Sequence, residues 1–112
     1  RAADVGLTPV RLLNDSERLG MSNKIYEYLH ARLPIVTSDG CAQGEFVRAE
    51  DAGAVVTGLD PPDLARAVVA LAYVPPEVGR RRAERLRGIA RERFCWEVEA
   101  KAIEAVYASI GP

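Results

Sequence analysis

The stretch that decides the fold is KIYEYLHARLPIVTSDG, residues 24–40. Its first part places apolar side chains at helical spacing, with Ile25 and Leu29 four residues apart, and so predicts an amphipathic helix. Pro34 disfavours helical geometry in the residue before it and therefore marks the turn out of the helix. The apolar residues 35–38 follow directly and predict a short buried strand. A helix joined in this way to a buried strand is typical of an open parallel sheet, which binds ligands at its rim.

Strands and helices alternate along the rest of the chain, which predicts an α/β fold with a Rossmann-like parallel sheet, right-handed crossovers and flanking helices. Three short strands make a narrow sheet, and the first has no preceding strand and helix to cover its far edge. We therefore expect a domain truncated on its N-terminal side and closed by C-terminal helices. Before the deciding stretch we expect a strand at 3–7 and a polar loop at 14–16. After it we expect a glycine-containing loop at 40–44 that leads into a helix through 45–47, and then a strand at 53–57. A helix opened by Asp60-Pro61-Pro62-Asp63 and ended by Pro75-Pro76 follows, and two helices between 77 and 110 separate near Phe94 and Trp96.

Length and composition indicate a small single domain and argue against nucleic-acid binding, a cysteine metal site and a membrane-spanning segment. A chain of 112 residues holds one domain at most, and its formal net charge of −1 gives no electrostatic steering toward nucleic acid. Cys41 and Cys95 are far apart, without CxxC spacing, and are expected to be reduced thiols rather than metal ligands. Because the chain has no run of about 18 apolar residues and no signal-like start, we expect a soluble, cytoplasmic protein.

The start of the helix in the deciding stretch is a candidate anion site. Ser22 is a good N-cap, and Lys24 falls in the first turn, where the helix dipole disfavours a cation by about 0.3–1 kcal/mol. A bound diphosphate would reverse that sign, with Ser22 or Asn23 donating further hydrogen bonds. Glu27, on the same stripe as Lys24, could accept two ribose hydroxyl protons. The alternative is an exposed contact between Lys24 and Glu27 worth a few tenths of a kcal/mol.

Residues 22–53 resemble the donor-binding half of the retaining glycosyltransferases of the two-Rossmann-domain (GT-B) type, often called family 4. That family carries a run such as Pro-x-Lys-x-x-Glu-Tyr, then a small-residue helix, a Pro-Val-Val-like strand, a Glu-x-Val and a glycine. Residues 3–7 resemble the preceding strand, and 60–71 and 94–107 resemble the closing helices, so the resemblance covers nearly the whole chain. The matching residues are Lys24, Glu27, Tyr28, Pro34, Ile35, Val36, Ser38, Asp39, Glu45, Val47 and Gly53.

The chain also departs from the family pattern. The related signature with two glutamates eight positions apart would place an acid at position 19, where this chain has Leu19, and the Lys-x-x-Glu-Tyr variant has proline where this chain has Ser22. The resemblance therefore carries over Glu27 as the ribose-binding acid and Lys24 as a phosphate contact. Glu45 either approaches the donor or only favours the start of a helix electrostatically.

The resemblance implies that residues 1–112 are a partial C-terminal nucleotide-sugar-binding domain. Its activity would be transfer of a sugar from a nucleotide-diphosphate sugar, with no separate cofactor, to a sugar, lipid or small-molecule acceptor held by an absent N-terminal domain. From the residues themselves we expect no metal, because no carboxylate pair has ligand spacing, and the balanced charge indicates no nucleic-acid partner. We expect the isolated chain to bind nucleotide weakly and not to transfer sugar. The alternative is a non-catalytic Rossmann-like module for nucleotide binding or protein interaction.

Four other features allow two interpretations each. His30 is either a general base or a surface or packing residue, and the 40–44 loop either cradles phosphate or only connects elements. The arginine-rich segment 80–93, which acids interrupt, is either an ion-paired solvated face or a contact with the anionic inner face of the membrane. Trp96 and Tyr107, at helical spacing, predict core or interdomain contacts.

Overall fold

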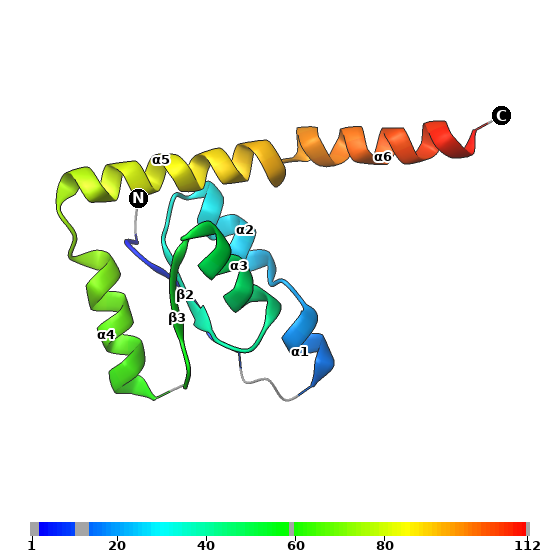
Figure 1. Ribbon diagram of the computed structural model, residues 1–112. Helices are drawn as coiled ribbons and strands as arrows, with labels where there is room; N and C mark the ends of the chain where they lie inside the picture. The colour runs from blue at the N-terminus through cyan, green and yellow to red at the C-terminus, as the bar shows by residue number, and fades with distance from the viewer. Residues whose placement is uncertain (1–2, 11–13, 59, 112) are drawn as a thin grey trace.

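The computed structural model describes residues 3–10, 14–58 and 60–111, and they form an α/β fold around a three-stranded parallel sheet (Figure 1). The strand order is β1-β2-β3, so each crossover leads to the next strand along the sheet. This confirms the predicted Rossmann-like class. The strands are β1 (Gly6–Thr8), β2 (Ile35–Ser38) and β3 (Gly53–Val56), with Gly6 opposite Ile35 and Ile35 opposite Gly53.

The helices form two layers around this sheet. Figure 1 shows α2 and α3 on one side of the sheet and α4 on the other, while α5 crosses above one end of the sheet and α6 extends away from the body. α5 packs on α2, and α4 packs on β3. The helices are α1 (Asp15–Leu19), α2 (Asn23–His30), α3 (Ala42–Glu50), α4 (Pro61–Ala72), α5 (Pro76–Arg93) and α6 (Trp96–Ile110).

The core lies between the sheet, α2, α3 and α5. Ile25 and Leu29, the pair that predicted the helix, are both fully buried. Burying a side chain of this size contributes about 1.5–3 kcal/mol, so this pair holds α2 firmly over the sheet. The buried apolar cluster consists of Ile25, Leu29, Ile35, Val47, Ala52, Leu86 and Ala90.

The segment expected to be a polar loop at residues 14–16 forms the start of a helix instead. The Oδ1 atom of Asn14 accepts a hydrogen bond of 2.9 Å from the Glu17 N–H, so Asn14 is the N-cap of α1. Asn favours both turns and N-caps, and here the cap prevails. The first strand also lies slightly later than the predicted 3–7.

The expected glycine-containing loop at 40–44 is also wrong in part, because α3 begins at Ala42. Gly44 is buried inside this helix, and a Cβ added there would collide with the backbone carbonyl oxygen of Ser38. The glycine therefore serves a close approach between helix and strand rather than a flexible loop. Gly40, with a φ of 76°, makes the tight turn that precedes the helix.

α6 leaves its apolar face open. Trp96 and Tyr107 are each 72% exposed, so the prediction that they belong to the core of this domain is wrong. Among the described helices, none is both long and apolar enough to cross a bilayer.

Candidate functional site

The carboxyl ends of the three parallel strands lie at one edge of the sheet, and α2 and α3 begin at that same edge. Chain direction requires this, because each helix leads back from the end of one strand to the start of the next. Ligands of open α/β sheets bind in the crevice outside these strand ends. This edge, the carboxyl edge, is therefore the candidate site.

A buried glutamine joins the elements that meet at the carboxyl edge. Gln43, in the first turn of α3, is 2% exposed. Its Oε1 accepts a hydrogen bond of 2.7 Å from the Ser22 N–H. Its Nε2 donates to the carbonyl oxygen of Thr8 at 3.3 Å and to Oγ1 of Thr37 at 3.2 Å. One side chain thus connects β1, β2, α3 and the start of α2.

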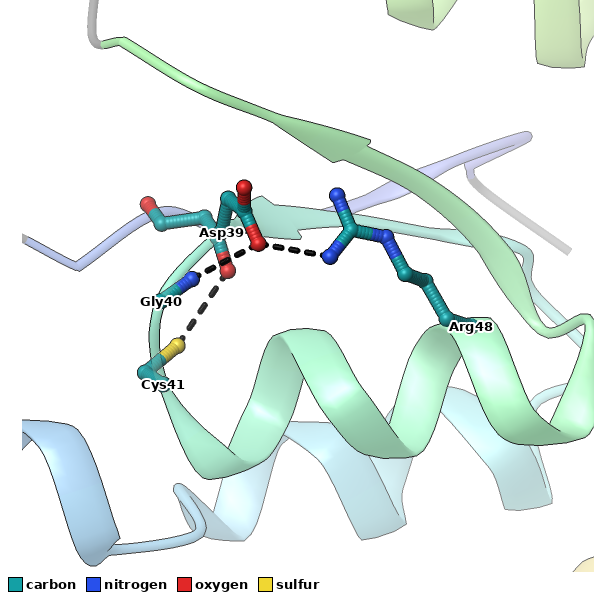
Figure 2. Close-up of polar contacts among 5 residues, drawn as sticks. Asp39, Gly40, Cys41 and Arg48 are labelled. Atoms are coloured by element: carbon teal, nitrogen blue, oxygen red, sulfur yellow. Dashed lines mark hydrogen bonds and ion pairs between the residues drawn. The ribbon is translucent and has the colours of Figure 1, made fainter.

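Two further contacts fix the ends of β1 and β2. Oγ of Ser38 accepts a hydrogen bond of 2.7 Å from the Val10 N–H, just beyond β1. The thiol of Cys41 donates to the carbonyl oxygen of Ser38 at 3.2 Å (Figure 2). Within the described part of the chain, no buried side-chain nitrogen or oxygen lacks a hydrogen-bond partner. The carboxyl edge is therefore preorganised by local polar contacts.

Asp39, which follows β2, is engaged by an arginine. Figure 2 shows its carboxylate between the side chain of Arg48 and the backbone N–H of Gly40. Nη1 of Arg48 lies 2.6 Å from Oδ1, and the Gly40 N–H donates to the same oxygen at 2.8 Å. The Arg48 hydrogen bond, followed by that of Gly40, lowers the pKa of Asp39. This carboxylate is thus charged at neutral pH and holds α3 against the end of β2.

A hollow of about 290 Å³ opens at the carboxyl edge, between α1, the start of α2 and α3. Of the residues predicted from the sequence to form the site, Ser22 lines it. The α1 residues were missed, and Gln43 was considered only as part of the 40–44 loop, without a role of its own. The signal for α1 was the N-capping residue Asn14, which the sequence interpretation assigned to a loop. The lining residues are Val10, Ser16, Glu17, Gly20, Met21, Ser22 and Gln43.

The first turn of α2 presents a positive helix end. Oγ of Ser22 accepts a hydrogen bond of 3.2 Å from the Lys24 N–H, which confirms Ser22 as the N-cap. The hydroxyl proton of Ser22 can still be donated elsewhere. The first turn carries no acidic residue, and both Asn23 and Lys24 are exposed. An anion placed there would meet the helix dipole and the lysine together.

Lys24 and Glu27 lie on the solvent-exposed flank of α2. The neighbouring Tyr28 is anchored to the sheet, since its hydroxyl donates to the Leu7 carbonyl oxygen at 3.0 Å. Lys24 lies one turn before Tyr28 and therefore nearer the carboxyl edge. Among the described residues, no ion pair joins Lys24 to Glu27.

The opposite flank of α2 packs on the end of α5. The Tyr26 ring lies 5.0 Å from the Phe94 ring, centroid to centroid, and Nε2 of His30 donates to the Phe94 carbonyl oxygen at 2.8 Å. His30 is thus an exposed residue whose ring is engaged by the end of α5, at the end of α2 that lies away from the carboxyl edge. Its geometry does not favour the general-base interpretation.

The predicted site residue Glu45, and Leu19 at the position where the related signature has an acid, stand apart from the hollow. Glu45 is exposed in the first turn of α3, where an acid stabilises the helix end, and it does not line the hollow. Leu19 is 77% exposed at the end of α1. In residues 3–10, 14–58 and 60–111, no group of three His, Cys, Asp or Glu side chains is placed to hold a metal ion.

The arginine-rich helix α5 is partly ion-paired at its exposed surface. Such exposed pairs contribute at most about 1 kcal/mol each, so they shape the surface more than they stabilise the fold. The pairs with neighbouring acids are Arg81 with Glu77, Arg85 with Asp51, and Arg93 with Glu50.

The family model described as "Glycosyl transferases group 1" matches residues 1–73. The match spans all three strands and α1 to α4, and it includes the complete carboxyl edge. No curated protein and no solved structure matches the chain significantly.

Proposed function

The chain belongs to the group 1 glycosyltransferases, and we propose that it forms the donor-nucleotide-binding portion of a retaining enzyme. That enzyme would transfer a sugar from a nucleotide-diphosphate sugar to an acceptor. The observation that carries the proposal is the first turn of α2. It opens at the carboxyl edge of a parallel sheet, carries Lys24 and contains no acid.

The diphosphate of the donor would lie at this helix end. When the sugar leaves, negative charge develops on the diphosphate, and fixed positive groups stabilise it without costly reorganisation. The ammonium group of Lys24 and the helix dipole supply that charge. The Ser22 hydroxyl and the Asn23 side chain add neutral hydrogen-bond donors.

Glu27 would hold the ribose of the same nucleotide. It lies three residues beyond Lys24 on the same flank, which separates the two by about 4.5 Å along the helix axis. A ribose is the group next to the diphosphate, so this order along the helix matches the order of the ligand's own parts. An exposed carboxylate can accept both ribose hydroxyl protons.

The proposal gives this chain the donor side of the reaction. The acceptor, a sugar, lipid or small molecule, would be bound by a further domain, and Glu45 would face the donor from α3. Binding and orientation of the leaving diphosphate are the contributions assigned to the residues of α2.

Calorimetric titration of the chain with uridine, guanosine and adenosine diphosphates tests this proposal. We expect one nucleotide to bind, and Glu27→Ala to weaken its binding by about 1–3 kcal/mol through loss of a charged hydrogen-bond partner. Glu84→Ala, which removes an exposed glutamate from α5, is the matched control and should leave the affinity unchanged.

Two results would contradict the proposal. One is the absence of binding by the native chain to all three nucleotides. The other is an equal affinity of the native chain and Glu27→Ala, which would place the bound nucleotide somewhere other than α2.

A further inference from the structure

We propose that Gln43 is a positioning residue for the donor site: its buried side chain fixes the N-terminus of α2 through the Ser22 N–H. This inference rests on the proposed donor function. It concerns a residue on another helix, which the sequence pattern did not single out.

The hydrogen bonds of Gln43 are directional and in a protected position. The amide is 2% exposed, so each of its bonds replaces one to water that cannot be regained inside the protein. The shortest of them, at 2.7 Å, is the one from the Ser22 N–H. Ser22 is the N-cap, so this bond holds the residue from which α2 starts.

The amide of Gln43 supplies both an acceptor and donors at this position. Its oxygen accepts from Ser22, while its NH₂ group donates to Thr8 and Thr37. Thr37 in turn donates to the Thr8 carbonyl oxygen at 2.9 Å. The NH₂ group of Gln43 is thus hydrogen-bonded to two strands, and its carbonyl oxygen holds the start of α2 in a fixed position relative to those strands.

The effect on a ligand follows from geometry. A diphosphate at the start of α2 must lie against the N-terminal end of the helix, a hydroxyl and an ammonium group at the same time. A small displacement of the helix start weakens all of these contacts together. Loss of the bond between Gln43 and Ser22 should therefore reduce nucleotide affinity, although Gln43 itself need not touch the nucleotide.

Three variants separate this role from a general effect on stability. Gln43→Met removes the acceptor and both donors, Gln43→Glu keeps an oxygen that can accept from Ser22, and Thr37→Val disturbs the strand side of the network only. At a temperature where circular dichroism shows every variant folded, we expect Gln43→Met to bind the preferred nucleoside diphosphate about tenfold more weakly. Gln43→Glu and Thr37→Val should bind within about twofold of the native chain.

A double-mutant cycle tests the route of the effect. Ser22 has a φ of −63°, which proline can adopt, and proline has no N–H to donate. If Gln43 acts through that N–H, the affinity loss of Gln43→Met should vanish in a Ser22→Pro background. If Gln43→Met does not fold, Ser22→Pro compared with Ser22→Ala removes the same hydrogen bond, and the proline variant should bind more weakly.

The outcomes that overturn the inference are distinct. Equal affinity of Gln43→Met and the native chain, equal loss in Thr37→Val, or full additivity with Ser22→Pro would each exclude the positioning role while the donor function stands. In the fallback comparison, equal affinity of Ser22→Pro and Ser22→Ala would do the same. Absence of nucleotide binding by the native chain would overturn the donor function and this role together.

Discussion

Asp39 and Arg48 form an ion pair whose effect on stability depends on pH. Arg48 lowers the pKa of Asp39 below the ordinary value of 3.8, so the native state binds this proton less readily than the unfolded chain does. The pair therefore stabilises the fold above that ordinary value, and its contribution is lost as the pH falls through the lowered pKa. The dependence is confined to acid conditions, well below neutral pH.

Replacing Arg48 with methionine should remove this dependence. We expect the pKa of Asp39, measured by NMR titration, to rise toward its ordinary value, and the difference in melting temperature from the native chain to shrink as the pH falls below about 4. Arg81→Met, which breaks the exposed pair with Glu77 on α5, is the control and should leave the titration of Asp39 unchanged. A native titration curve in Arg48→Met would show that the ion pair does not form in solution.

At the residue scale, local signals were readable from the sequence and distant ones were not. Ser22 was predicted as an N-cap and is one, because capping involves neighbours two or three residues away. The role of Gln43 was missed because its partners include Thr8 and Ser22, which lie 35 and 21 residues away in the chain. Neither hydrophobic periodicity nor a sequence motif predicts a contact between residues so far apart in the chain. The roles of Lys24 and Glu27 remain predictions.

At the scale of elements, hydrophobic periodicity predicted helices and strands well, whereas residues that favour both loops and helix starts led to errors. The periodic helices and β2 were found with nearly correct ends, since burial of one face imposes spacing on the sequence. The helix α1 was missed and the start of α3 was placed too late, because Asn14 and Gly44 also favour loops. Only tertiary contacts decide whether such a residue lies in a loop or in a helix. For Gly44 the deciding contact is the close approach to the carbonyl oxygen of Ser38.

Two glycine-to-alanine substitutions in helices should therefore have opposite effects. Gly44→Ala places a Cβ against the rigid backbone of β2, and we expect it to destabilise the chain by about 1–3 kcal/mol despite alanine's better helix propensity. Gly88→Ala in α5 has no atom within 4 Å of the added Cβ and should stabilise by about 0.5–1 kcal/mol. Urea denaturation measures both, and a shift of the same sign in the two variants would contradict the close approach of α3 to β2.

At the scale of the whole molecule, the chain divides into a packed body and a projecting helix. The buried apolar cluster of the body takes its residues from α2, β2, α3, α5 and Ala52, and α5 contributes Leu86 and Ala90. α6 continues outward from the end of α5 (Figure 1). Its amphipathic spacing correctly predicted a helix, but spacing alone does not identify the surface that a helix face will cover. Of the two alternatives predicted for Trp96 and Tyr107, their exposure contradicts burial in the core of this domain, and the interdomain contact stays a prediction.

The projecting part of α6 should contribute little to the stability of the body. Residues 101–111 are all exposed, so a chain ending at Ala100 loses almost no buried apolar surface. We expect its thermal unfolding, followed by circular dichroism at 222 nm, to remain cooperative with nearly the same midpoint, and its nucleotide affinity to be unchanged. Leu86→Ala on α5 is the contrasting variant, because removing that fully buried side chain should cost about 2–5 kcal/mol. A large drop in the midpoint of the shortened chain would mean that α6 folds back onto the body in solution.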